Sequence, residues 1–533
     1  MKKDLDLEYE LLVKKAENLS LAEGNVIKER RALGKNYEVI YVQALESFDI
    51  SNLLFYPYEA IPKVYSPLSP EWEEAGCIAS VQQNPALNLS GDGVIVGLVD
   101  SGLDIYDDIF RFVGGSSRVG VFWDQEKGKV YRREEINRIL QEGNETERPI
   151  ASWDEGGHGS YVAGIAAGRI GGVATEAELA VVKLKEVRPF LRELYQLPEK
   201  GTFYQENDIM EGVAFLDDYA MEKGKPIVLC FCLGTNQGDH EGGSYLGEML
   251  SDWMQRQNRM VICGAGNEAL HRHHFFGAGG ESPGGKSGIM EIRVDEDAQG
   301  FYVESYVKAP DQLRVAVVSP TGEVYEGILP GESEGFHRFR VENTEIYQRA
   351  SNVVGMNLNR LVRTFFRNPT PGIWKLLGRT EGEMHSWLPL EAQLQAEVVF
   401  IRSDPDTTVV EPSNAPLLLS VAAFDTITEG IFIESGRGYS KSGVVKPELA
   451  APGVDIVSPY RQEMRSSTSG AAAVTAGSAV LLTQWAVGRG ETTRGVDIKE
   501  RLLSGVREKE GVSYPNREWG YGMLCLRDSF YKG

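Results

Sequence analysis

Three short segments of the sequence bring together residue types that could carry out nucleophilic catalysis. Asp100 follows an apolar run, and His158 precedes a run of small residues. Ser469 opens a second small-residue run, which an apolar run continues to residue 482. A serine hydroxyl needs a base to take its proton, and that base needs a carboxylate to fix its tautomer and stabilise its cation. The order Asp, His, Ser therefore indicates a nucleophilic triad.

The surrounding residues predict the elements that would hold these side chains. The apolar run before Asp100 is typical of a buried strand, which would leave the carboxylate at its carboxyl end. The runs after His158 and Ser469 predict buried helices. At the N-terminus of its helix, Ser469 would meet unpaired N–H groups and the positive end of the helix dipole. Taken alone, such a serine is more simply an N-cap, so its interpretation as a nucleophile depends on Asp100 and His158.

The three segments resemble the catalytic motifs of the subtilisin-type serine proteases, in the same chain order. The matching residues are Asp100-Ser101-Gly102, His158-Gly159-Ser160 and Thr468-Ser469-Gly470-Ala471. A fourth segment, 261–268, resembles the strand that ends in the family's oxyanion-hole asparagine, which is Asn267 here. The resemblance implies a serine endopeptidase in which Asn267 and the backbone N–H of Ser469 hold the oxyanion.

Substrate-binding residues are also implied by the resemblance. Cys232, Leu233 and Gly234 stand where subtilisins have Ser-Leu-Gly, a backbone segment that pairs with the substrate chain and walls the specificity pocket. Glu268 follows Asn267, and two interpretations of it stay open. It could lie at the base of the pocket and accept a basic side chain, or it could be an exposed glutamate at the rim.

Five residues depart from the usual motifs of the family. Ser160 and Tyr161 replace the last two residues of His-Gly-Thr-His, and Ser467, Gly470 and Ala473 alter the serine motif Gly-Thr-Ser-Met-Ala-x-Pro. None of the five removes a nucleophile, a base or an oxyanion donor. They loosen the expected geometry around the serine without removing its chemistry.

Four further segments resemble the Csp-type subtilases of clostridial spores. They are 122–125, 233–238, 435–439 and 519–522. Those relatives carry a jelly-roll insert and activate a cortex-lytic enzyme during germination. Because some of them have lost triad residues, the alternative to an active protease is a catalytically silent regulator or scaffold. The presence of all three triad residues here favours the enzyme.

The N-terminal residues 1–70 predict a small α+β domain. The apolar spacing of 7–16 predicts a helix, and 37–43 predicts a strand. Residues 56–70 are rich in proline, which forbids a helix and favours an extended chain. The position matches a subtilase propeptide, so the resemblance implies one autoproteolytic cut within 62–72 and a prodomain that stays bound in the active-site cleft. The alternative is a plain N-terminal domain with a linker.

Residues 71–285 and 403–533 are expected to form a three-layer α/β catalytic domain with a parallel sheet. Apolar runs that predict buried strands alternate with stretches that predict helices. The strands are expected at 179–187, 227–233, 260–264 and 417–423, and the helices at 209–221 and 245–257. This alternation places the chemistry at the carboxyl ends of the strands.

Residues 286–402 are expected to form an inserted all-β domain. Short alternating segments separated by turn signals, with no strong helix among them, predict a β-sandwich. These segments lie at 290–294, 301–307, 313–318 and 371–377. The insert resembles the jelly roll of some subtilases.

Composition limits the partners of the protein. The net charge of −22 argues against nucleic acid or an anionic membrane. No stretch approaches the roughly 20 apolar residues of a membrane span, and no apolar region of a secretion signal follows the basic N-terminus. The expected location is cytoplasmic or spore-associated, and the expected partners are a protein or peptide substrate and the chain's own prodomain.

Cysteine and histidine usage gives no sign of a metal site. The histidines at 271, 273 and 274 form a cluster, but no carboxylate or thiol within it has a ligand-like spacing. No metal ion or other cofactor is therefore expected. The cysteines show no framework pattern and are predicted to be buried free thiols; they are Cys77, Cys230, Cys232, Cys263 and Cys525.

Overall fold

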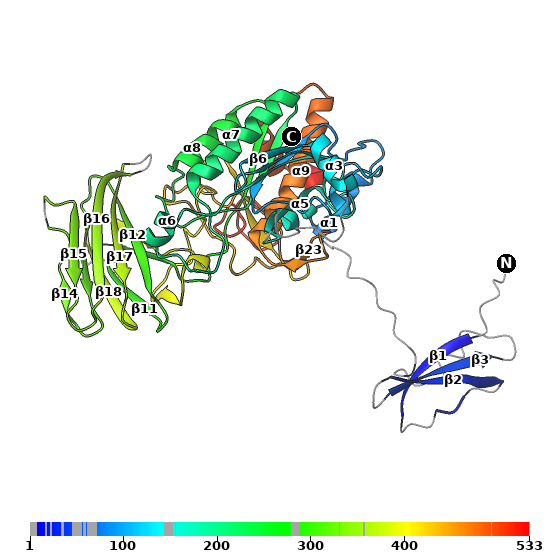
Figure 1. The fold of residues 1–533 in the computed structure, drawn as a ribbon, viewed down its shortest axis with the longest axis horizontal. Coiled ribbons are helices and arrows are strands. Elements are labelled where there is room, and N and C mark those ends of the chain that lie inside the picture. Colours follow the sequence, from blue (N-terminus) through cyan, green and yellow to red (C-terminus); the bar gives the residue numbers. More distant parts are fainter. Residues whose placement is uncertain are drawn as a thin grey trace. The chain divides into compact units, whose positions relative to one another are not determined.

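The computed structural model divides the chain into two compact units, Met1–Ser69 and Pro70–Gly533 (Figure 1). The residues that the structure describes are 8–15, 19–21, 24–33, 37–44, 56, 60, 72–142, 153–154, 156–278, 288–329, 331–354, 358–491 and 493–531. The interval 62–72, where a cut is predicted, lies outside the described residues except for Trp72.

The smaller unit contains a three-stranded antiparallel sheet in the order β1-β3-β2. Its strands are β1 (Glu8–Lys14), β2 (Asn25–Leu33) and β3 (Tyr37–Ala44). β3 confirms the predicted strand, but the helix expected over 7–16 is wrong because β1 occupies this stretch. Leu11 and Val13 are both buried in the core of the unit. A spacing of two residues places side chains on the same face of a strand, which explains the error.

The larger unit contains an eight-stranded sheet in the order β22-β21-β9-β8-β4-β7-β5-β6. Neighbouring strands run parallel except β5 and β6, which are antiparallel. The central strands are buried along their whole length, as expected for a parallel sheet covered on both faces. The strands are β4 (Ile95–Asp100), β5 (Val119–Asp124), β6 (Lys129–Arg132), β7 (Glu178–Lys183), β8 (Ile227–Phe231), β9 (Arg259–Gly264), β21 (Leu419–Phe424) and β22 (Leu449–Pro452).

Helices cover this sheet and give the three-layer α/β arrangement expected from the sequence. The predicted helices are present as α7 and α8, which lie side by side in Figure 1. α5 and α9 pack against each other, and α9 also contacts five strands of the sheet. The helices are α1 (Trp72–Ala75), α2 (Ala79–Gln82), α3 (Arg133–Glu142), α5 (His158–Ala167), α6 (Pro189–Leu194), α7 (Glu206–Lys223), α8 (Tyr245–Gln255), α9 (Thr468–Gly488), α10 (Gly495–Ser504) and α11 (Leu526–Ser529).

An all-antiparallel β-sandwich with its own hydrophobic core interrupts the α/β part of the unit. One sheet has the order β10-β19-β12-β17-β16-β15 and the other β14-β13-β18-β11-β20. β10 joins the sandwich although it precedes residue 286, where the sequence placed the start of the insert. The strands are β10 (His274–Ala278), β11 (Ile289–Val294), β12 (Gly300–Lys308), β13 (Arg314–Val318), β14 (Val324–Tyr325), β15 (Glu334–Arg338), β16 (Glu345–Val354), β17 (Asn359–Arg367), β18 (Gly372–Arg379), β19 (Glu383–Trp387) and β20 (Val398–Phe400).

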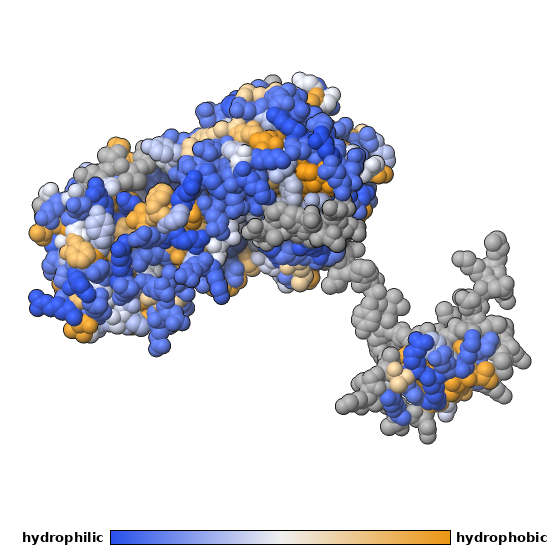
Figure 2. All heavy atoms as spheres, viewed as in Figure 1, coloured by the Kyte–Doolittle hydropathy of each residue, from blue (hydrophilic) through white to orange (hydrophobic). Residues whose placement is uncertain are grey.

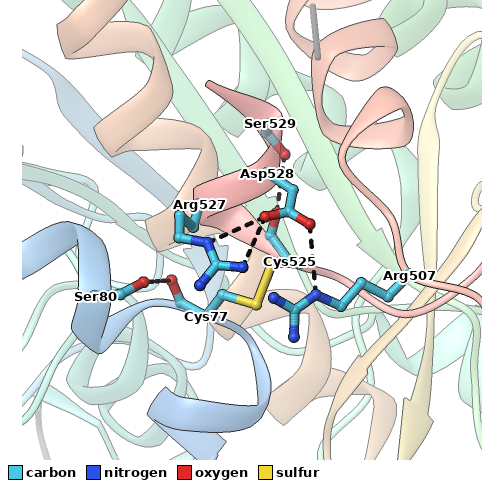
Figure 3. The surroundings of a disulfide bond; sticks show 7 residues. All are labelled: Cys77, Ser80, Arg507, Cys525, Arg527, Asp528 and Ser529. Carbon is cyan, nitrogen blue, oxygen red and sulfur yellow. Dashed lines mark hydrogen bonds and ion pairs between the residues drawn. A yellow bond between two sulfur atoms is a disulfide. The ribbon is translucent and has the colours of Figure 1, made fainter. Parts of the chain in front are cut away.

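A disulfide bond joins the two ends of the larger unit (Figure 3). Cys77 and Cys525 are 448 residues apart, so the prediction of a free thiol is wrong for both. The fold brings them together, because the backbone N–H of Leu526 donates to the carbonyl of Gly76 at 2.9 Å. A pair so distant in the chain leaves no spacing signal. The free thiols among the described residues are Cys230, Cys232 and Cys263.

The surface and the longest apolar helix agree with a fold built around an internal core. Figure 2 shows that the visible face of the larger unit is mostly hydrophilic. Among the described residues, α9 is the one helix long and apolar enough to cross a membrane, and 83% of its apolar window is buried inside the unit. α9 is therefore placed as the central helix of the α/β core.

Candidate active site

Asp100 and His158 meet at the carboxyl end of β4. Asp100 is the last residue of β4 and is 1% exposed, whereas His158 is the first residue of α5. Nδ1 of His158 lies 2.8 Å from Oδ1 and 3.0 Å from Oδ2 of Asp100. The carboxylate thus holds the proton of the neutral imidazole on Nδ1, and this leaves Nε2 as an acceptor.

Ser469 completes this series from the N-terminus of α9. Its Oγ lies 3.2 Å from Nε2 of His158. The preceding Ser467 caps the helix, because its side chain accepts a hydrogen bond from the N–H of Gly470 at 3.2 Å. Backbone N–H groups of the first turn have no acceptor within their own helix. The structure therefore brings Asp100, His158 and Ser469 together as the sequence predicts. Since Asn267 and Ser467 accept from the N–H groups of Thr468 and Gly470, the N–H of Ser469 is the donor that this turn offers beside the hydroxyl.

Asn267 follows β9 and faces the start of α9. Its Oδ1 accepts a hydrogen bond from the N–H of Thr468 at 3.0 Å, which assigns the orientation of the amide. In addition, Oγ1 of Thr468 accepts from the N–H of Gly266 at 3.1 Å. Because Oδ1 of Asn267 is engaged by Thr468, Nδ2 of Asn267 is left to donate to an external acceptor. Together with the N–H of Ser469, it can stabilise an oxyanion.

The charge of Asp100 governs the protonation of His158. Burial alone would lower the pKa of His158, but the charge of Asp100 and its hydrogen bond to the ring outweigh burial and raise that pKa to about 9. The nearby guanidinium of Arg465 has a weaker, lowering effect. The imidazole in the unliganded site is thus mostly protonated at neutral pH.

Activity should therefore increase with pH well beyond neutrality. Only the neutral imidazole can accept the proton of Ser469, so kcat/KM should rise about tenfold per pH unit below a pKa of about 9 and level off above it. Steady-state kinetics on a peptide without titratable side chains would measure this profile, with circular dichroism as the control for folding. A plateau reached below pH 7 would contradict the raised pKa.

Asp154 is a positioning residue that sequence reasoning missed. It is 5% exposed, and its carboxylate accepts hydrogen bonds from the hydroxyl of Ser101 at 2.7 Å and the N–H of Gly157 at 3.0 Å. It also accepts from the N–H and the hydroxyl of Ser160, at 2.8 and 2.5 Å. Asp154 thus connects the loop after β4 to the first turn of α5, which carries His158. An acidic residue just before a predicted helix was the available signal.

Replacing Asp154 with Ala should lower both stability and turnover. The change leaves buried donors without an acceptor, at a cost on the order of 3 kcal/mol in the free energy of unfolding. Because His158 loses its support, kcat should fall at least about tenfold with little change in KM. Asp154→Asn, which keeps one acceptor oxygen, should give an intermediate loss. Thermal melts and active-site-titrated kinetics would test this, and an unchanged kcat per titrated site would show that Asp154 has only a structural role.

Two departures from the family motifs compensate for each other. The hydroxyl of the buried Tyr161 lies 3.3 Å from the carbonyl oxygen of Ile456, beside the start of α9. A Cβ added at Gly470 would lie only 3.2 Å from this hydroxyl. The glycine thus makes room for the large ring, so the serine motif and the histidine motif change together.

Cys232, Leu233 and Gly234 line a cavity of about 320 Å³ that also contains Asp100 and His158. The three residues predicted to bind substrate therefore lie beside the triad. Cys232 is half-buried, and its thiol lies 3.7 Å from both the carbonyl oxygen of Ser469 and the thiol of Cys230.

Val410 is a second residue that sequence reasoning missed. Its side chain fills the space between Gly234 and Gly266, since a Cβ on either glycine would lie 2.4 or 2.6 Å from one of its methyl groups. Gly234 is one of the three residues predicted to bind substrate, and Gly266 directly precedes Asn267. Val410 therefore fills space between the backbone segment of the predicted substrate-binding residues and the segment that carries Asn267.

Glu268 does not occupy the exposed rim that one interpretation gave it. It is 7% exposed, and its Oε2 accepts a hydrogen bond from Nδ1 of His273 at 2.7 Å. The rim interpretation is wrong because this pair buries the carboxylate. The neighbouring His274 contacts His385 instead, at 3.0 Å between ring nitrogens. In the described part of the chain, no group of three His, Cys, Asp or Glu side chains could hold a metal ion.

The fold and the site together define a class of protein. A three-layer α/β domain carries a hydrogen-bonded Asp–His–Ser series at the carboxyl ends of its strands, next to an amide donor and a helix N-terminus. This arrangement is that of a serine hydrolase with a preformed oxyanion site.

Comparison with protein families shows to which family of serine hydrolases the chain belongs. The Subtilase family matches residues 91–291 and 390–522, which together are more than half of the chain. The chain therefore belongs to the subtilase family and is a subtilisin-like serine endopeptidase. The gap between the two matched ranges covers most of the β-sandwich. Curated protein sequences give no match.

Solved structures similar to this chain include one with a TM-score above 0.5. The CspB protease of Clostridium perfringens is 27% identical, with a TM-score of 0.76 over 87% of this chain and 97% of that chain. This likeness supports a Csp-type subtilase. The prenylagaramide maturation protease PagA is 13% identical, with a TM-score of 0.41 over 84% of this chain and 97% of that chain. MycP1 of the ESX-1 type VII secretion system is 14% identical, with a TM-score of 0.39 over 89% of each chain.

Proposed function

We propose that this protein hydrolyses peptide bonds in protein substrates with Ser469 as nucleophile and that it cleaves its own N-terminal domain once. The observation that supports the catalytic roles is the hydrogen-bonded series Asp100–His158–Ser469, with 2.8 Å and 3.2 Å between successive partners. An intact series of this kind supports an active enzyme over a catalytically silent regulator. A cytoplasmic or spore-associated location is part of the same proposal.

The proposed reaction follows from the geometry. Nε2 of His158 accepts the proton of Ser469 as Oγ attacks the substrate carbonyl, and Asp100 stabilises the imidazolium that forms. Nδ2 of Asn267 and the N–H of Ser469 hold the oxyanion. His158 then gives the proton to the leaving amine, and water hydrolyses the acyl-enzyme by the same steps. The charged product of each proton transfer is stabilised by a group already in place.

Cleavage in cis is supported by chain connectivity. The smaller unit has its own core, formed by residues such as Leu11 and Ile40, and a proline-rich segment follows it. A tethered segment reaches an effective concentration on the order of mM or more at an active site on the same chain. Cleavage should fall within 62–72, and the released prodomain should stay bound in the cleft as an inhibitor.

Denaturing electrophoresis of the purified protein tests this proposal. Wild type should give fragments of roughly 8 and 51 kDa, from a domain of about 70 residues, and the two should elute together under native conditions. Ser469→Ala should run as one intact chain, whereas the neighbouring control Ser466→Ala should be cut like wild type. A wild-type chain that stays whole would contradict autoprocessing, and a Ser469→Ala chain cut at the same place would assign the cut to another protease.

A further inference from the structure

A second cavity lies beside the catalytic one, at the junction of the α/β domain and the β-sandwich. It has a volume of about 660 Å³. It shares part of its wall with the catalytic cavity, and the sandwich supplies other parts of the wall. The shared wall residues are Thr202, Tyr204, Leu233 and Gly234. A substrate that runs along Leu233 and Gly234 would therefore pass this cavity.

Two buried carboxyl groups from different parts of the fold line the cavity. Glu304, on β12 of the sandwich, is 5% exposed and accepts hydrogen bonds from the N–H of Gly238 at 3.2 Å and the hydroxyl of Tyr306 at 2.8 Å. Glu411, in the α/β domain, is 2% exposed and accepts from the hydroxyl of Ser244 at 3.2 Å. Its Oε1 is buried and has no hydrogen-bond partner among the described residues.

The two glutamates lie close to each other around one glycine. Glu304 bonds to the backbone of Gly238, and a Cβ added at Gly238 would lie 3.2 Å from the carboxyl carbon of Glu411. A third glutamate, Glu206, is exposed and also lines the cavity. Among the described residues of this wall, none is Lys, Arg or His.

Among the described residues, no Lys, Arg or His forms an ion pair within 4.0 Å with either of the two buried carboxyl groups. Lys441 is bound elsewhere, with Nζ 3.3 Å from Glu241 and 2.6 Å from Asn359. Arg363 stands opposite Glu304 on β17, but no ion pair within 4.0 Å joins them in the described residues. Burial raises the pKa of Glu304 despite the charge of Arg363. For Glu411, burial and the charge of Asp239 raise the pKa to about 8.

The rest of the wall favours a cationic side chain. Five aromatic side chains line the cavity, and two of them, Tyr195 and Tyr302, have ring centroids 5.3 Å apart. Aromatic faces attract ammonium and guanidinium groups, and a guanidinium can also bind a carboxylate in a bidentate manner. A cation would supply the missing partner of Oε1 of Glu411 and allow both glutamates to ionise. The aromatic residues are Tyr195, Phe203, Tyr204, Phe231 and Tyr302.

We infer that this cavity is a substrate subsite for an arginine or lysine side chain, built jointly by the sandwich and the α/β domain. The inference rests on the proposed protease function, because it gives a selectivity to the same cleft. In an extended substrate, successive residues advance about 3.3 Å and side chains alternate in direction. One basic residue on the N-terminal side of the scissile bond enters the cavity and ion-pairs with Glu304 and Glu411. The role of the insert is then to complete the substrate site.

A positional scan of peptide substrates tests this subsite. Each position from two to six residues before the scissile bond carries arginine or citrulline in turn, because citrulline is a neutral analogue of nearly the same shape. Wild type should prefer arginine by at least about tenfold in kcat/KM at one position. Glu304→Gln and Glu411→Gln should reduce that ratio to below about threefold, since glutamine keeps hydrogen-bonding capacity without charge. Glu342→Gln is the matched control, a buried glutamate of the same insert outside this wall.

The readouts separate this inference from the proposed function. Every variant is titrated with a fluorophosphonate, so that ratios refer to active sites. A ratio near one at every position, or a ratio that both glutamine variants leave intact, would overturn the subsite while the protease function stands. If no peptide is cut, binding of N-acetyl-arginine amide to Ser469→Ala by calorimetry, after removal of the N-terminal domain, still tests the subsite. Binding that disappears when Glu411→Gln is added would support it, and no binding would overturn it.

Discussion

The buried charge of Asp100 is the constraint on which the rest of the site depends. A carboxylate that is 1% exposed is stable as an anion only with strong partners, and here those partners are the ring of His158 and the N–H of Ser101. The need of this carboxylate for a partner fixes the orientation of the His158 ring. The ring orientation in turn fixes where Nε2 can accept the proton of Ser469. Asp154 supports the same arrangement by joining the loop after β4 to the helix that carries the imidazole.

The inserted β-sandwich contacts residues 235–240, the segment that directly follows the predicted substrate-binding residues 232–234. The ring of His240 stacks on that of Trp387 from the sandwich, with centroids 3.9 Å apart. The amide of Asn236 donates to the carbonyl of Leu388 at 3.1 Å, and Glu304 accepts from the backbone of the same segment. Since this segment continues directly from Gly234, the sandwich holds the wall along which a substrate lies.

The sequence allowed the triad and most of the core strands to be predicted, because each is encoded locally by a chemical residue type beside an apolar or small-residue run. Long-range pairing has no such local code, and this is why the disulfide of Cys77 and Cys525 was missed. A helix is wrongly predicted for β1 because Leu11 lies four residues after Leu7, a spacing that also places side chains on one face of a helix. The position of Val410 between two glycines and the burial of Glu268 against His273 result from tertiary packing, so the sequence alone does not indicate them.

The central claim is that Asp100 and His158 activate one particular hydroxyl. The most direct test is mass-spectrometric mapping of a fluorophosphonate adduct after removal of the N-terminal domain, in wild type, Asp100→Asn and Ser469→Ala. The account predicts a single adduct on Ser469 in wild type, labelling at least about a hundredfold slower in Asp100→Asn, and none in Ser469→Ala. A folded wild type that is not labelled, or that carries the adduct on another serine, would contradict it.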